Sequence, residues 1–230
     1  MNFFNTQGPI LRRKQTYLDV QDLDGLIAWR WNINQRPIIS WLYTRIDQVF
    51  LSWGWITGFI FLTPQLFPLI SWHDQAIFWS ALSLVGIGVM TWLAWFWVKI
   101  ERFRWLIYLW SALVVIGLGL TDYGIFMGSG LILMNLCPLW LVLCAIGYSA
   151  MGWGMRSRTF LMVAALHCVT IPLLSLASAY QFLITAVTIS SSLFFLAEVQ
   201  WDMRPPVYSE ALSQTQNEFN QQQQRLRVLG

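Results

Sequence analysis

The chain consists of long apolar segments separated by short polar ones. Because the hydrocarbon core of a bilayer is about 30 Å thick, an α-helix needs roughly 20 apolar residues to cross it, with every backbone polar group paired inside the helix. Six segments meet this requirement, at residues 49–70, 76–98, 105–121, 131–152, 159–178 and 180–199. The pattern predicts an all-α fold: a polytopic integral membrane protein whose residues 49–199 form a bundle of six transmembrane helices.

The boundary between the last two segments is marked only by the weakly polar residues 175–181. Together these segments hold roughly forty apolar residues, far more than one crossing needs. We therefore expect two helices joined by a tight hairpin rather than one long helix.

Basic residues give an independent test of this topology. With the N-terminus in the cytoplasm, six spans place all 14 Lys and Arg residues on the cytoplasmic side. This distribution follows the positive-inside rule. We therefore predict that both termini are cytoplasmic, and that basic anchors lie at the inner face, namely Arg12, Arg13, Lys14, Lys99, Arg102, Arg104, Arg156 and Arg158.

Composition excludes an ordinary soluble domain. Only 11% of the residues are charged and 57% are hydrophobic, whereas a soluble domain carries about 25% charged residues. The net charge of +3 is too small to indicate nucleic acid as a partner. The partners we expect are the lipid bilayer and other integral membrane proteins. The predicted location is a bacterial plasma membrane, with a thylakoid-type internal membrane as the alternative.

Residues 1–48 form a cytoplasmic N-terminal segment that mixes apolar and basic residues. In helical register, its end carries one apolar stripe, formed by Ile38, Trp41, Leu42, Ile46 and Phe50. Such a stripe beside basic residues is typical of an amphipathic helix that lies on the membrane surface. The prediction is an interfacial helix on the inner leaflet, and the alternative is a simple extension of the first span.

Residues 200–230 are predicted to be a mobile, Gln-rich cytoplasmic tail. Pro205 and Pro206 end any preceding helix, and the tail contains four consecutive glutamines at 221–224. Leu212, Phe219 and Leu226 are spaced by seven, so a short coiled coil with a partner is the alternative.

The middle of each span lacks charged side chains. Charges inside a membrane commonly mark proton paths, ion sites and catalytic groups. The pattern therefore argues against a pump, an ion-coupled carrier and an intramembrane enzyme. We predict that the protein is not an enzyme and that it has no catalytic residue and no metal site. No cofactor is expected, and a pigment (haem or chlorophyll) is the alternative.

Two uncharged polar side chains with hydrogen-bonding capacity lie inside apolar segments. His167 falls near the middle of the fifth span, and Asn135 falls in the fourth. We expect both to be hydrogen bonded, with Asn135 reaching across to another helix. The alternative for His167 is that an imidazole nitrogen ligates a haem or a chlorophyll.

Tryptophan is abundant, with 15 residues in the chain. Trp92, Trp95 and Trp97 cluster at the cytoplasmic end of the second span, where indoles favour the headgroup level. Interfacial anchoring is the expected role, and stacking against a pigment or another ligand is the alternative.

Glycines within the spans indicate where helices approach closely. The first span has a GxxxG pattern, and the next two spans each carry a closely spaced pair. The helix-packing candidates are Gly54, Gly58, Gly86, Gly88, Gly117 and Gly119. Packing within this chain is the expected use, and pairing with another membrane subunit is the alternative.

Three functional hypotheses follow. The preferred one is a non-catalytic membrane subunit or assembly factor that packs against other membrane proteins of a larger complex. The second is a membrane component that captures or transports a small neutral solute, which the absence of central charges would favour. The third is a pigment- or quinone-binding protein that uses His167 and the tryptophan cluster.

Overall fold

The computed structural model describes residues 3–4, 9–12, 14, 17–33 and 36–229. For residues 29–41, 228 and 229 it describes the backbone alone.

The structure is mostly helical, and its described residues include six helices that are long and apolar enough to cross a membrane. They are α2 (Arg45–Leu66), α3 (Trp72–Ile100), α4 (Arg104–Phe126), α6 (Leu136–Met155), α7 (Arg158–Leu176) and α8 (Gln181–Glu198), the last preceded by the 3-10 turn η1 (Ser178–Tyr180). The prediction of a helical protein with six membrane-length apolar segments is confirmed. The faint boundary near residue 178 does separate two helices.

Two differences between the observed and the predicted helix bounds have a clear local cause. Helix α2 starts at Arg45, four residues before the predicted span, because Thr44 and Asp47 form a capping box there. A capping box satisfies two backbone donors that the first turn would leave unpaired. Before α6, the predicted span 131–152 is interrupted, and residues 130–133 form the separate short helix α5 (Gly130–Leu133).

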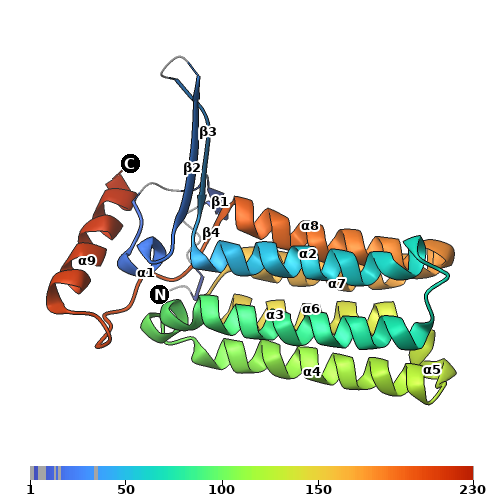
Figure 1. Cartoon of the computed structure of the whole chain (residues 1–230). Coiled ribbons are helices and arrows are strands. Elements are labelled where there is room, and N and C mark those ends of the chain that lie inside the picture. Colours follow the sequence, from blue (N-terminus) through green and yellow to red (C-terminus); the bar gives the residue numbers. More distant parts are fainter. Residues whose placement is uncertain (1–2, 5–8, 13, 15–16, 34–35, 230) are drawn as a thin grey trace.

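Five of the long helices contact one another in a closed ring. Helix α2 contacts α3, α3 contacts α4, α4 contacts α6, α6 contacts α8, and α8 returns to α2. Helix α7 lies outside this ring and packs against α6 and α8 (Figure 1). The ring places one face of each of five helices toward a common interior.

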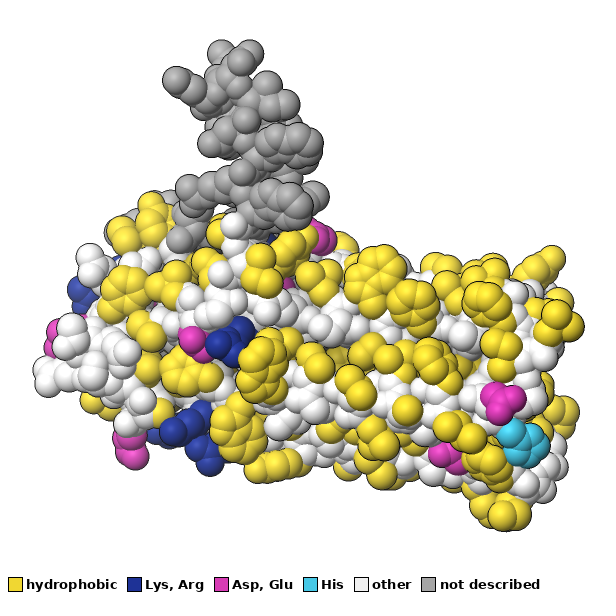
Figure 2. All heavy atoms as spheres, in the orientation of Figure 1, with side chains coloured by type: hydrophobic (Ala, Val, Ile, Leu, Met, Phe, Trp, Pro, Cys, Tyr) yellow, Lys and Arg dark blue, Asp and Glu magenta, His cyan; other side chains and the backbone are white. Residues whose placement is uncertain are grey.

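The two ends of the helices differ in charge. We call the end formed by Arg45, Ile100, Arg104, Met155, Arg158 and Glu198 the basic end, and the opposite end, at Leu66, Trp72, Phe126, Leu136 and Gln181, the distal end. Figure 2 shows Lys and Arg side chains gathered at the basic end, while the long surface beyond it is mostly hydrophobic. The described elements nearest to the two termini, β1 (Leu11–Arg12) and α9 (Gln214–Leu229), also lie at the basic end (Figure 1).

A β-hairpin replaces the predicted interfacial helix. Strands β2 (Ile27–Ile33) and β3 (Arg36–Tyr43) pair antiparallel, so the prediction of a helix containing Ile38, Trp41 and Leu42 is wrong. Only the end of that stripe, at Ile46 and Phe50, is helical, and it belongs to α2. The hairpin extends crosswise from the basic end (Figure 1).

Three features of the sequence explain why this segment forms strands rather than a helix. From Ile27 to Ile33 the sequence IAWRWNI alternates large apolar residues with smaller or polar ones, the period of a strand. Residues 37–43 are rich in Ile, Trp and Tyr, which favour strands. Pro37, near the start of the second segment, also opposes a helix interior.

Beyond the helices, the C-terminal residues also differ from the prediction. The sequence indicated a mobile tail, whereas the structure has helix α9 (Gln214–Leu229) there. Helix α9 packs against the short helix α1 (Val20–Leu23), and the strand β4 (Gln200–Trp201) pairs with β1 (Leu11–Arg12). The two chain ends are therefore joined to each other at the basic end.

Candidate functional site

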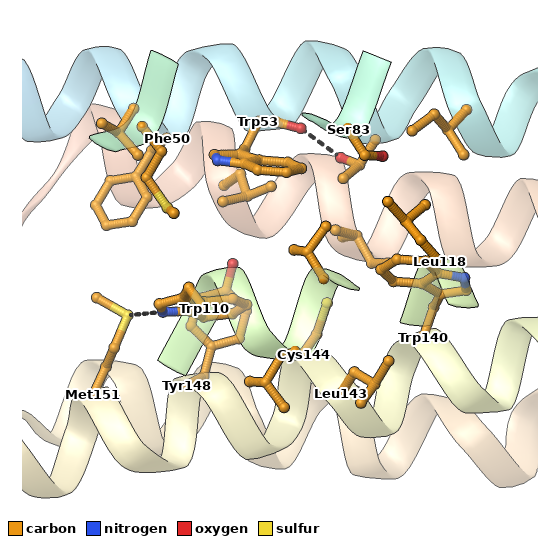
Figure 3. A pocket seen from close by; sticks show the side chains of 18 of the residues that line it. Phe50, Trp53, Ser83, Trp110, Leu118, Trp140, Leu143, Cys144, Tyr148 and Met151 are labelled. Carbon is orange, nitrogen blue, oxygen red and sulfur yellow. Dashed lines mark hydrogen bonds between the residues drawn. The ribbon is translucent and has the colours of Figure 1, made fainter. Parts of the chain in front are cut away.

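An apolar cavity lies inside the ring of five helices. Its volume is about 150 Å³, and its lining comes from α2, α3, α4, α6 and α8 (Figure 3). Engineered apolar cavities of similar size stay free of water and bind small apolar molecules. Because five helices contribute to its lining and almost all of that lining is apolar, we treat this cavity as the candidate functional site.

The cavity is elongated along the helix axes. Its lining on α2 runs from Ile46 to Phe61, and on α4 from Leu106 to Asp122. At a rise of 1.5 Å per residue, these stretches correspond to roughly 22–24 Å. The cavity therefore extends through most of the thickness of a hydrocarbon core.

Aromatic side chains dominate the middle of the cavity. The indole of Trp53 lies across it, with Trp110 and Trp140 on the opposite wall (Figure 3). The Trp110 Nε1–H donates to Met151 Sδ at 3.1 Å, and the Trp140 Nε1–H donates to Thr121 Oγ1 at 3.1 Å. Trp53 Nε1 is buried and has no hydrogen-bond partner in the described part of the chain.

The distal end of the cavity is its most polar part. Asp122 lines it, and Asp122 Oδ2 accepts a hydrogen bond from Ser80 Oγ at 2.9 Å. Asp122 Oδ1 is buried and has no partner among the residues described. Thr121, beside it, lines the cavity and donates through Oγ1 to the Gly117 carbonyl at 2.8 Å.

His167 lies outside this cavity. It is fully buried on α7 against the ring of Tyr148 on α6, with 5.2 Å between the ring centres. His167 Nδ1 is 2.8 Å from the Val163 carbonyl oxygen in its own helix, while Nε2 is buried without a partner among the described residues. The expected bond to a neighbouring carbonyl is present, and it is made within α7.

Asn135 does not make the predicted hydrogen bond across helices. It is exposed, and its Nδ2 donates to the Leu131 carbonyl at 2.8 Å. The reason is its position at the N-cap of α6, directly after the short helix α5, where a carbonyl of the preceding turn is within reach.

The three clustered tryptophans do not converge on one site. Trp92 is 71% exposed and Trp95 is 40% exposed, whereas Trp97 is buried, lines the cavity and donates through Nε1 to Asp22 Oδ1 at 3.2 Å. Trp92 lies near the Arg45 guanidinium, 5.8 Å from the ring centre. Of the predicted ligand-contacting residues, only Trp97 belongs to the cavity.

Four of the six candidate glycines pack against neighbouring helices. A Cβ atom at Gly54 would meet the Phe194 ring of α8 at 2.6 Å, and one at Gly58 would meet Ser190 of the same helix at 3.1 Å. Gly86 faces Trp53 of α2, and Gly117 faces Trp140 of α6. Added Cβ atoms at Gly88 and Gly119 would have no neighbour within 4 Å.

The predicted basic anchors that the structure describes lie at or beside the basic end. Lys14 pairs with Asp47 at 2.8 Å, and Arg158 pairs with Asp202 at 2.9 Å. Arg104 and Arg156 lie over the rings of Trp95 and Phe3, respectively. The remaining anchors are Arg12 in β1, Lys99 in the last turn of α3 and Arg102 in the α3–α4 turn; Arg13 lies outside the described residues.

A buried polar network lies at the basic end, and the sequence did not predict it. Gln21 Nε2 donates to Glu101 Oε1 at 2.9 Å, and Asn220 Nδ2 of α9 donates to Gln21 Oε1 at 2.9 Å. Burial raises the pKa of Glu101 to about 7, nearby Asp22 and Asp19 add to this effect, and Arg204 opposes it. Burial also raises the pKa of Asp22 to about 7.

A second network holds the start of α7. Asp202 accepts hydrogen bonds from the backbone N–H groups of Arg158 and Thr159, both at 3.0 Å, and from the hydroxyls of Ser157 and Thr159. Burial alone would raise the pKa of Asp202, but hydrogen bonds from Arg158 and Thr159 together outweigh it and lower that pKa. Asp202 therefore serves as the N-terminal cap of α7 from 43 residues away.

Comparisons with protein-family models, with curated proteins and with solved structures gave no match to this chain. Among the described residues, no group of three or more His, Cys, Asp and Glu side chains is placed to hold a metal ion.

Neither Trp53 nor Asp122 was singled out by the sequence as a site residue. Asp122 accepts from Ser80, which lies 42 residues away in another helix. The position of an Asp near the end of an apolar span was the one available signal in the sequence.

Proposed function

We propose that this protein is a non-catalytic integral membrane protein that binds a small, mostly apolar molecule inside the ring of five helices. The observation that supports this proposal is the elongated apolar cavity lined by α2, α3, α4, α6 and α8. This favours the solute-capture hypothesis over the subunit hypothesis that the sequence alone preferred.

The energetic cost of an empty cavity supports occupancy. Cavities in protein cores cost about 24 cal/mol for each Å³. For a volume of about 150 Å³, the cost is about 4 kcal/mol, a large fraction of a typical folding free energy. An apolar molecule that fills the space would recover much of this cost.

A cavity-filling variant tests the proposal. Ala94 is buried on α3 and lines the cavity, whereas Ala81 on the same helix is exposed. In a thermal-shift screen of vitamins, quinones and lipids, we expect at least one neutral compound to raise the unfolding temperature of the wild type and of Ala81→Phe. The same compound should leave Ala94→Phe unchanged. Equal shifts in both variants, or no shift with any compound, would contradict the proposal.

We further propose that the basic end faces the cytoplasm, with both termini inside. The gathering of Lys and Arg at that end supports this orientation (Figure 2), because basic residues remain on the cytoplasmic side of membrane proteins. Cysteines introduced at Asp74 and Met127, at the distal end, should react with an impermeant reagent added outside intact cells. If a cysteine at Gln222 reacts instead, the basic end faces the outside, and the proposed orientation is wrong.

In this orientation the β2–β3 hairpin would run along the inner membrane surface, since it extends crosswise to the helices (Figure 1). The interfacial role that the sequence suggested for this segment is thus retained as a proposal, with a hairpin in place of a helix. Exposed Trp92 near Arg45, at the base of the hairpin, supports a headgroup-level position.

A role as a subunit of a larger complex is the second candidate. Gly88 and Gly119 support it, because they lie on the outer surfaces of α3 and α4 with no atom near their Cβ positions. Replacement of both by Leu should abolish co-purification of a membrane partner after mild solubilisation. A strictly monomeric wild-type chain would argue against this candidate.

Pigment binding through His167 remains a separate proposal. It draws on the unpartnered, buried Nε2 atom of His167. Absorption spectra of the purified wild type and of His167→Ala test it, since a bound haem or chlorophyll absorbs visible light. We expect a visible absorption band in the wild type that is lost in the variant; a colourless wild type would contradict this proposal.

A further inference from the structure

We infer that the molecule held in the cavity is a single-chain amphiphile, whose hydrogen-bond-donating head group lies beside Asp122 and whose apolar chain points toward the basic end. This inference rests on the proposed function and adds the class of ligand and its direction. Three features of the cavity lead to it: its polarity gradient, an unpartnered carboxylate oxygen and its length.

The polarity of the lining changes along the cavity. At the distal end, Thr121 and Asp122 contribute polar side chains. At the basic end the lining is apolar, with Ile46, Phe50 and Val98 among its residues. An amphiphile bound in one direction would match this gradient, whereas a symmetric hydrocarbon would leave Asp122 Oδ1 without a partner.

The Asp122 carboxylate presents a specific binding group. Ser80 donates to Oδ2 at 2.9 Å, but Oδ1 is buried and has no partner among the described residues. A buried carboxylate oxygen without a hydrogen bond is costly. A hydroxyl or ammonium group on the ligand would donate to Oδ1 and remove this cost, whereas a ligand carboxylate would be repelled.

The length of the cavity favours a chain over a compact molecule. Along α4 the lining extends from Leu106 to Asp122, roughly 24 Å at 1.5 Å per residue. The volume of about 150 Å³ is small for this length, so the free space is narrow. A narrow apolar space of this volume suits one short alkyl chain, of about eight carbons, because apolar cavities of about 150 Å³ bind molecules as small as benzene.

Competition photolabelling tests the inference in lipid nanodiscs that contain the full chain. The probe is an eight-carbon alcohol with a diazirine next to its hydroxyl group. The competitors are octanol, octylamine, octane and octanoate. We expect labelled peptides from the distal end of the cavity, around Thr121 and Trp79. We also expect octanol or octylamine to compete about tenfold better than octane, since one hydrogen bond to a charged acceptor gives at least that factor.

Variants at Asp122 identify the head group. Asp122→Leu should abolish the advantage of the polar competitors over octane. Asp122→Asn should preserve the advantage of octanol but remove that of octylamine, so the pair of variants distinguishes a hydroxyl ligand from an ammonium ligand. Asp74→Asn is the matched control at the same end, because Asp74 is exposed and does not line the cavity.

Two kinds of failure are distinguishable. Labelling within the cavity that is equal for all competitors, or that falls near Phe50 and Val98 instead of Thr121, would overturn the inference and leave the proposed function standing. Labelling confined to the outer, lipid-facing residues would overturn both.

Discussion

At the scale of single residues, the polar groups at the basic end are the main departures from an otherwise apolar interior. Glu101 is 1% exposed, and its Oε2 atom is buried with no partner in the described part of the chain. Its other oxygen accepts from Gln21. Such a carboxyl group resists ionisation, and the fold must therefore respond to pH at this position.

Glu101 gives the first prediction. Its folded pKa of about 7 lies above the ordinary value of 4.5 for a Glu side chain, so the folded state holds the proton more tightly. Stability should therefore fall as pH rises from about 4.5 to beyond 7. Glu101→Gln removes this loss. We expect the variant to be more stable than the wild type at pH 8, by up to about 3 kcal/mol, and equal to it at pH 4.

Thermal unfolding in detergent at the two pH values measures this difference, with about 2–4 °C expected for each kcal/mol in a chain of this size. The control is Glu218→Gln, since Glu218 is exposed on α9. If the unfolding temperature of Glu101→Gln changes with pH as much as that of the wild type, Glu101 does not cause the pH dependence. Asp22, whose pKa is also raised to about 7, would then be its source.

Asp202 gives a prediction of opposite sign. Its pKa is lowered in the folded state, so its contribution is present above the unfolded pKa, near 4, and is lost as pH falls through the folded value. Asp202→Asn should reduce stability at pH 7 by about 1–3 kcal/mol, because charged hydrogen bonds to the start of α7 are lost. The gap between variant and wild type, measured by thermal unfolding, should close near pH 2; a gap that persists there would be inconsistent with this explanation.

At the scale of elements, glycine placement determines how closely α2 and α8 approach. An Ala at Gly54 would place its Cβ 2.6 Å from the Phe194 ring, so we expect Gly54→Ala to cost about 1–3 kcal/mol through overpacking. Gly88→Ala, with no neighbour within 4 Å, should be neutral or stabilising by up to about 1 kcal/mol. Unfolding in denaturing detergent compares the two, and equal effects would mean that the helices are not in contact at Gly54.

Helix α9 gives the second prediction for elements. Asn220 is buried, its Oδ1 accepts from the Val20 backbone N–H at 2.8 Å, and its side chain also donates to Gln21. Asn220→Ala should release α9 and speed amide hydrogen exchange at Val20 and along residues 214–227. Gln222→Ala, at an exposed position of the same helix, should not. If exchange is already fast in the wild type, the tail is mobile as its sequence suggested.

The same elements show which parts of the fold the sequence could predict. Long apolar segments fix their own helical structure because an unpaired backbone is too costly in lipid, so all six helices were predictable. The hairpin at Ile27–Tyr43 was missed because apolar and polar residues there fit a helical stripe as well as strand alternation. Helix α9 was missed because its hydrogen-bond partners Val20 and Gln21 lie 200 and 199 residues away from Asn220.

At the scale of the whole molecule, the ring of five helices creates the candidate site, and no local pattern predicts it. The lining residues Trp53, Ser83, Leu118 and Tyr148 come from four helices, and each is an unremarkable member of its own apolar segment (Figure 3). The choice of inward faces depends on contacts between helices that are far apart along the chain. The cavity is a property of the assembled ring.

The occupancy of this cavity is the central claim, and native mass spectrometry of the protein released from lipid nanodiscs tests it most directly. We predict a wild-type population that carries one additional small molecule of defined mass, retained by Ala81→Phe and absent from Ala94→Phe. A wild-type protein that carries no such molecule under conditions that preserve its fold, or an Ala94→Phe variant that retains it, would contradict the account.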